Sequence, residues 1–159
     1  MKRIVALVLS LALLCSIPVF ASAATESEGS SSQPEIVWYA DGSRMEIHTE
    51  ILDNSASPYS ATASYTRSAT TTGDYYNVDD VLVFTYTLKA SFSYDKVSYS
   101  KCTSASDSYS IKKSGWKKVE SNVSRSGDTA YADATFSGNG DYAYPSLQLS
   151  CDPFGNISD

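Results

Sequence analysis

The sequence predicts an all-β protein: a single-domain antiparallel β-sandwich of immunoglobulin-like architecture with about seven to nine strands. Two observations lead to this prediction. From Glu35 onward, apolar and polar residues alternate with a period of two, and no segment sustains the three-and-four spacing of an amphipathic helix. Short turn-forming groups of Gly, Asp and Asn separate these segments, as they do in sandwiches and barrels.

Residues 1–23 have the three parts of a secretory signal peptide. Lys2 and Arg3 form a positively charged start, residues 4–20 are apolar apart from two serines, and Ala21-Ser22-Ala23 fits the A-x-A cleavage signal. The apolar run is at the short limit for a membrane span and polar residues follow it directly. We therefore expect cleavage before Ala24, a secreted, extracellular product, and no membrane span after signal removal.

Residues 24–34 contain only small, polar and acidic side chains besides Pro34, which predicts a flexible polar leader before the sandwich domain of residues 35–159. The whole chain has a formal net charge of −6. Signal cleavage removes two of the 12 basic residues and none of the 18 acidic ones. A nucleic-acid partner is excluded on this charge, because phosphate binding needs a basic footprint.

The clearest strand runs from Val81 to Tyr94, where Phe84, Tyr86 and alternate neighbours share one apolar face. Its length predicts a bend or bulge through which it serves both sheets. Two further strands show good alternation, and six weaker ones complete the sandwich: 44–51 and 128–136, then 36–40, 59–69, 96–103, 109–112, 116–123 and 147–151. Turns are expected at Asp41-Gly42, Gly73-Asp74, Gly127-Asp128 and residues 138–141.

Cys102 and Cys151 are the two cysteines that remain after signal removal, and an exported pair normally forms a disulfide bond. We therefore expect one. Cys151 is in phase with inward-facing leucines, whereas Cys102 alternates with Val97 and Tyr99 and points away from them. Either a bulge intervenes before Cys102 or the bridge lies at the rim of the sandwich.

From residue 81 onward, the order of motifs resembles an uncharacterised family of small secreted Ser/Thr-rich β proteins of clostridial and related Gram-positive bacteria. The matching motifs are Phe92-Ser93-Tyr94-Asp95, Lys101-Cys102-Thr103-Ser104, Ser114-Gly115-Trp116, residues 124–130, residues 147–151 and Gly155-Asn156. The resemblance covers roughly the C-terminal half and departs at Asp80-Val81, where the family has an aromatic residue. It implies a secreted β domain with its first and last cysteines paired, and it carries no catalytic residue across.

The sequence contains few candidate catalytic or metal-binding residues. His48 is the single histidine, which removes most triad and multi-histidine zinc arrangements. Glu46, His48 and Glu50 share one strand face, but alternation alone places three polar residues there. We expect a non-enzyme with no cofactor and no bound metal. One question stays open: Asp74, Asp79 and Asp80 have oxygen ligands that suit calcium, although acidic turn residues usually face water.

The strongest binding candidate is a basic segment around an aromatic residue, in which Lys112, Lys113, Lys117 and Lys118 flank Trp116. Such a patch suits an anionic cell-wall polymer or an acidic protein surface. The alternative is that lysines protect edge strands from aggregation and Trp116 belongs to the core. The basic residues between positions 96 and 125 are Lys96, Lys101, Lys112, Lys113, Lys117, Lys118 and Arg125.

Twelve tyrosines are the second compositional feature. Tyrosine suits sugar stacking and protein contacts, and it also simply suits β-strands. Tyr75 and Tyr76 are the ligand-binding candidates that we place with the basic segment. The tyrosines expected to be exposed are Tyr39, Tyr75, Tyr76, Tyr142 and Tyr144.

Two functions fit these features. The first is a secreted, non-catalytic module that binds a cell-surface glycan or a protein partner. The alternative is a secreted effector, either a bacteriocin-like toxin or an enzyme inhibitor, for which export and compactness are equally suitable.

Overall fold

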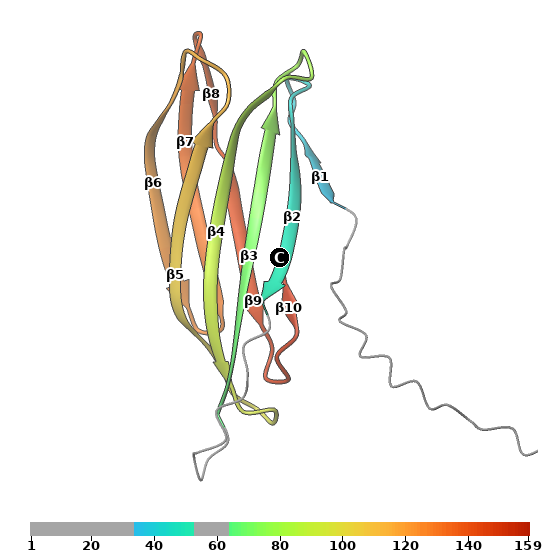
Figure 1. The fold of residues 1–159 in the computed structure, drawn as a ribbon, viewed down its shortest axis with the longest axis vertical. Coiled ribbons are helices and arrows are strands. Elements are labelled where there is room, and N and C mark those ends of the chain that lie inside the picture. The colour runs from blue at the N-terminus through green and yellow to red at the C-terminus, as the bar shows by residue number, and fades with distance from the viewer. Residues whose placement is uncertain (1–33, 53–63) are drawn as a thin grey trace, which may run out of the picture.

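The computed structural model describes residues 34–52 and 64–159, so the expected signal peptide and most of the leader lie outside the described residues. The described chain is all-β and forms two antiparallel sheets of five strands that are not closed into a barrel (Figure 1). The predicted β-sandwich is therefore confirmed. Within these ranges there is no helix long and apolar enough to cross a membrane.

The first sheet has the strand order β1-β2-β3-β4-β5, and the second has the order β10-β9-β7-β6 with β8 also paired to β7. β8 and β10 were not predicted because they are too short to show an alternating pattern, and the strands predicted separately at 96–103 and 109–112 are parts of one strand, β5. Their bounds are β1 Glu35–Trp38, β2 Arg44–Leu52, β3 Tyr65–Tyr76, β4 Leu82–Tyr94, β5 Ser100–Ile111, β6 Trp116–Ser126, β7 Thr129–Gly138, β8 Asp141–Ala143, β9 Ser146–Cys151 and β10 Ile157–Ser158.

Consecutive strands β1 to β5 form an up-and-down meander, and the chain changes sheet at the β5–β6 connection. The prediction that the long strand β4 serves both sheets is wrong. It pairs with β3 on one side and β5 on the other along its length, and two register shifts absorb its irregularity, one beside Tyr75 and one at Ser91/Phe92. A strand with neighbours on both sides has no free edge with which to join a second sheet.

The predicted turn at Gly73-Asp74 is also wrong, because both residues lie inside β3 and pair with β2 and β4. Glycine is needed there for packing. A Cβ atom on Gly73 would lie 2.7 Å from Sδ of Met45, which fills the space above it in the core. A strand glycine often marks such a close approach.

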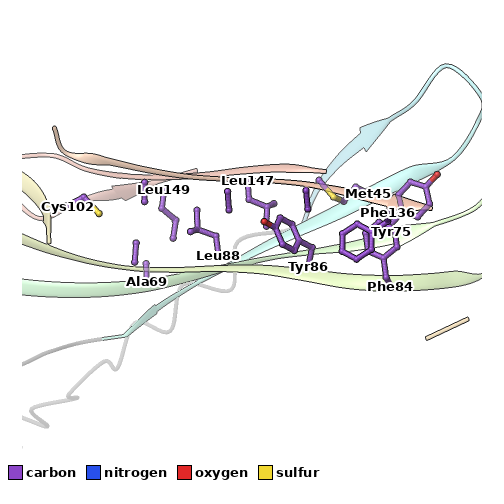
Figure 2. Packing of buried hydrophobic residues seen from close by; sticks show 14 of the residues in the cluster. Met45, Ala69, Tyr75, Phe84, Tyr86, Leu88, Cys102, Phe136, Leu147 and Leu149 are labelled. Atoms are coloured by element: carbon purple, nitrogen blue, oxygen red, sulfur yellow. The ribbon is translucent and has the colours of Figure 1, made fainter. Parts of the chain in front are cut away.

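The core lies between the sheets and contains the alternate residues of β4 together with those of β7 and β9. Phe84 and Phe136 stack across the sandwich with ring centroids 3.9 Å apart. Figure 2 shows Leu88 and Tyr86 of the first sheet facing Leu147 and Leu149 of the second. Burial of these apolar surfaces is the main favourable contribution to folding.

Candidate binding sites

Four turns meet at one end of the sandwich and enclose a cavity of about 250 Å³, here called the loop-end cavity. The turns are β1–β2, β3–β4, β5–β6 and β7–β8, which lie at the same end in Figure 1. The lining residues are Asp41, Ser43, Tyr75, Asn77, Val78, Asp79, Lys113, Trp116, Asn139 and Asp141. Three of the predicted ligand-binding residues, Tyr75, Lys113 and Trp116, are therefore brought together here.

Tyr75 and Trp116 both belong to the core, so the expectation that Tyr75 is exposed is wrong and the alternative that Trp116 is a core residue is confirmed. Their exposed fractions are 5% and 9%. The Tyr75 ring stacks on Phe84 with centroids 4.8 Å apart, and the Trp116 ring lies 6.0 Å from both. A Cβ atom on Gly138 would lie 2.4 Å from Cγ of Trp116, so the indole is also covered by β7. Both rings form the floor of the cavity and stabilise the fold.

A chain of hydrogen bonds fixes the polar wall of the loop-end cavity. The Tyr75 hydroxyl donates to Oγ of Ser43 at 3.0 Å, and the Ser43 hydroxyl donates to Oδ1 of Asp41 at 2.6 Å. The hydrogen bond from Ser43 lowers the pKa of the Asp41 carboxyl, so it is ionised at neutral pH. Burial raises the pKa of the Tyr75 hydroxyl, which stays protonated as a donor.

The four predicted lysines do not form one surface patch. Lys113 lines the loop-end cavity, and Lys112 and Lys117 are exposed. Lys117 and Lys118 are consecutive in β6 and so point to opposite sides of the strand. The Lys118 ammonium lies 4.7 Å from the ring centroid of Tyr109 and donates to Oγ of Ser121. Strand geometry therefore places the lysines of the predicted basic segment on different surfaces.

Tyr76 is half-buried, and an arginine covers its ring. The Arg44 guanidinium lies 4.3 Å from the Tyr76 ring centroid and 5.7 Å from that of Trp38. Ion pairs to Glu46 and Asp80 hold the guanidinium in place. Tyr76 is thus part of a cation–π cluster on the first sheet, which leaves less of its face for a ligand.

The carboxylates considered for calcium have separate partners. Asp74 accepts a hydrogen bond from the Thr85 hydroxyl at 2.6 Å, Asp80 pairs with Arg44, and Asp79 accepts one from the Asn77 amide. Residues 34–52 and 64–159 contain no group of three or more His, Cys, Asp or Glu side chains arranged to hold a metal ion. The structure therefore supplies no support for a calcium site at these aspartates.

A second hollow lies on the second sheet and was not among the predicted sites; we call it the tyrosine groove. Its volume is about 230 Å³. It is lined by Glu120, Ser121 and Asn122 of β6, Asp133, Ala134 and Thr135 of β7, and Tyr144 and Pro145 of the β8–β9 connection. Side chains that are 11 or more positions apart in sequence meet here because β6 and β7 pair, with Asn122 opposite Asp133.

Tyr144 forms one wall of the groove and stands beside Tyr142. The two rings are nearly parallel, with an interplanar angle of 10° and centroids 6.3 Å apart. Their exposed fractions are 64% and 60%, which confirms the expectation that both are exposed. The signal in the sequence was their spacing of two, which puts both rings on one side of the chain where it is extended.

The polar groups of the tyrosine groove are acidic or neutral. Glu120 and Asp133 supply carboxylates, Asn122 an amide and Thr135 a hydroxyl, which donates to Oε1 of Glu120 at 3.4 Å. None of the lining residues is basic. These groups donate hydrogen bonds to the hydroxyl groups of a ligand and accept hydrogen bonds from them, next to an aromatic face. The two carboxylates repel anions.

The predicted disulfide is absent from this structure, in which Cys102 and Cys151 are buried free thiols. Each Sγ atom faces a backbone carbonyl near it in sequence, that of Ser104 at 3.3 Å and that of Asp152 at 3.5 Å. Burial raises the pKa of both thiols. The expected bulge before Cys102 is not found. Cys102 points inward because Val97 and Tyr99, with which it is out of phase, are exposed, and the register shift at Ser91/Phe92 comes after it and leaves Thr103 without a partner in β4.

No family model matches this chain, and no curated protein matches it either. Among solved structures, it is similar to the crystal structure of a hypothetical protein from Listeria monocytogenes, with 16% identity and a TM-score of 0.43. The match covers 81% of this chain and 92% of that one. A likeness of this degree carries no functional argument.

Proposed function

We propose that this protein is a secreted, non-catalytic β-sandwich module that binds a cell-surface glycan through the tyrosine groove. The observation that carries the proposal is an exposed, nearly parallel pair of tyrosine rings at a groove that contains two carboxylates and an amide. The flat C–H face of a sugar stacks on such rings, while its hydroxyls bond to carboxylate and amide groups. Export to the cell exterior, expected from residues 1–23, would bring the module to such glycans.

The groove also indicates which glycans to test first. Because Glu120 and Asp133 are its charged lining residues, a neutral or amine-bearing sugar is favoured over a phosphorylated or sulfated one. Ala134 and Pro145 complete the lining but are buried, so Tyr144 supplies the exposed apolar surface of the groove.

The secreted chain would be tested against a panel of neutral, amine-bearing and anionic glycans and by co-sedimentation with cell walls. We expect retention by neutral or amine-bearing glycans. Tyr144→Ala is expected to weaken binding about tenfold, and Asp133→Asn by a similar factor. Phe154→Ala and Glu50→Gln are the matched controls, because Phe154 is as exposed as Tyr144 at 63% and Glu50 lies on the first sheet.

Retention by no glycan, or equal retention of the Tyr144→Ala and Phe154→Ala variants, would overturn the proposal. Growth inhibition of neighbouring bacteria, or inhibition of secreted hydrolases by a chain that binds no glycan, would favour the effector function instead.

A further inference from the structure

The end of the sandwich opposite the loop-end cavity contains a larger hollow of about 520 Å³, here called the basic cavity. It lies between the end of β4, the β4–β5 connection, the start of β5 and the β6–β7 turn. Its lining includes Ser93, Tyr99, Lys101, Thr103, Arg125 and Gly127, and Cys102 is buried at its wall.

Two cations and no carboxylate line this cavity. Lys101 lies on β5 and Arg125 on β6, so the cavity takes its charges from both sheets. Neither residue forms an ion pair with any of residues 34–52 or 64–159. Because the chain as a whole has a net charge of −6, this cavity is a local concentration of positive charge.

The carboxylates of Asp95 and Asp128, near this end of the sandwich, accept hydrogen bonds from residues close to them in sequence. The Asp95 carboxylate accepts hydrogen bonds from the backbone amides of Val97, Ser98 and Tyr99 at 2.8–2.9 Å. Those bonds lower the pKa of the Asp95 carboxyl. Asp128 accepts a hydrogen bond from the Thr129 hydroxyl. These carboxylates are thus engaged with their neighbours and are not part of the lining.

The walls of the basic cavity are held in place before any ligand binds. The three amide bonds to Asp95 fix the loop that carries Tyr99, whose side chain is 48% exposed. The Arg125 guanidinium donates to the carbonyl oxygen of Thr103, and the Cys102 amide donates to that of Gly127. A guanidinium has five N–H donors, so one bond to Thr103 leaves donors for an anion.

We propose that the basic cavity binds a phosphate or sulfate ester carried on a polymer, as a second site beyond the proposed neutral-glycan site. Arg125 would bind the oxyanion with two parallel N–H donors, and Lys101 would add a second positive charge. The exposed Tyr99 ring beside them offers an apolar face to the sugar or polyol that carries the ester.

The test is equilibrium binding of the secreted chain to a polyglycerol phosphate, a sulfated dextran and an uncharged dextran, at low and high salt. We expect binding to at least one charged polymer, with affinity falling as salt rises. Any binding of the uncharged dextran belongs to the tyrosine groove and should change neither with salt nor in Lys101→Gln. The two charged arms distinguish phosphate from sulfate. Lys101→Gln and Arg125→Gln are each expected to weaken binding about tenfold or more.

Lys112→Gln and Lys117→Gln are the matched controls, because both lysines are exposed and lie outside the basic cavity. If these controls lose as much affinity as Lys101→Gln, the binding is general charge attraction and the proposal is wrong; failure to bind either charged polymer also overturns it. Arg125→Gln removes a bond to the backbone, so Lys101→Gln keeps the test decisive if that variant unfolds. Tyr144→Ala should bind the anionic polymer normally, which separates this proposal from the tyrosine groove.

Discussion

The aromatic residues at the loop-end cavity and those at the tyrosine groove are chemically alike but lie in opposite environments. Tyr75 and Trp116 are nearly inaccessible and pack on Phe84, whereas Tyr142 and Tyr144 are mostly exposed and contact each other. The first pair packs in the core of the sandwich, and the second pair belongs to the surface that we propose binds a glycan. The comparison teaches that burial, and not the presence of an aromatic residue beside charges, decides its role.

The largest effect should come from Trp116→Ala. Removing a buried indole that packs between Phe84, Tyr75 and Gly138 is expected to lower the free energy of unfolding by about 3–5 kcal/mol. Chemical denaturation would measure it, with Tyr144→Ala as the exposed counterpart, expected within about 0.5 kcal/mol of the parent. Comparable losses in both variants would break the distinction between the two aromatic pairs.

A smaller effect is expected when only the tyrosine hydroxyl groups are removed. Tyr75→Phe deletes the buried hydrogen bond to Ser43 and is expected to cost about 0.5–1.5 kcal/mol of stability. Tyr142→Phe should cost nothing measurable, since its ring is 60% exposed. Thermal unfolding of the two variants side by side gives the comparison, and an unstable Tyr142→Phe would show that the exposed pair also supports the fold.

Alkaline pH should separate the same two classes of tyrosine. Burial raises the pKa of Tyr39, Tyr75 and Tyr86, so their protons bind more tightly in the folded chain than in the unfolded one. Their contribution to stability is complete below the unfolded pKa of about 10 and is lost as pH rises through the folded values. Ultraviolet titration should show delayed tyrosine ionisation coupled to unfolding; a single ordinary transition for every tyrosine would contradict it.

The smallest effect concerns the buried thiols. Because burial raises the pKa of Cys102 and Cys151, a thiol reagent should react slowly with the native chain at pH 8. Both thiols should react once a denaturant unfolds the chain in the absence of a reductant. If no thiol reacts after unfolding, the disulfide expected from the sequence forms in the protein.

Three strands could be predicted from local pattern, whereas β3 was expected at 59–69 and β5 as two separate strands. The alternation over residues 81–94 predicted β4 to within one residue at its start, and it identified Phe84, Tyr86, Leu88 and Phe92 as buried. Alternation also predicted β2 and β7 closely. These predictions succeed because a period of two depends only on which side of its own strand a residue occupies.

The candidate sites were predicted less well, since each depends on residues from several strands. Trp116 has four neighbouring lysines in the sequence, but its ring points into the core. The lysine side chains do not share one surface. The tyrosine groove requires the exact register of β6 on β7, which no short pattern specifies. Gly73 was interpreted as part of a turn. The steric constraint that requires a glycine there comes from the Met45 side chain, which lies on another strand.

By itself, the sequence determined that this chain forms strands with one apolar face, and which residues of the longest strand, β4, that face contains. Only the tertiary structure decided that acidic and aromatic residues gather at the tyrosine groove and that Lys101 and Arg125 line a cavity without carboxylates. The physical reason is one of range. Whether one face of a strand is apolar or polar depends on residues two positions apart in the sequence. Which residues line a cavity depends on the pairing of segments that are distant in the sequence.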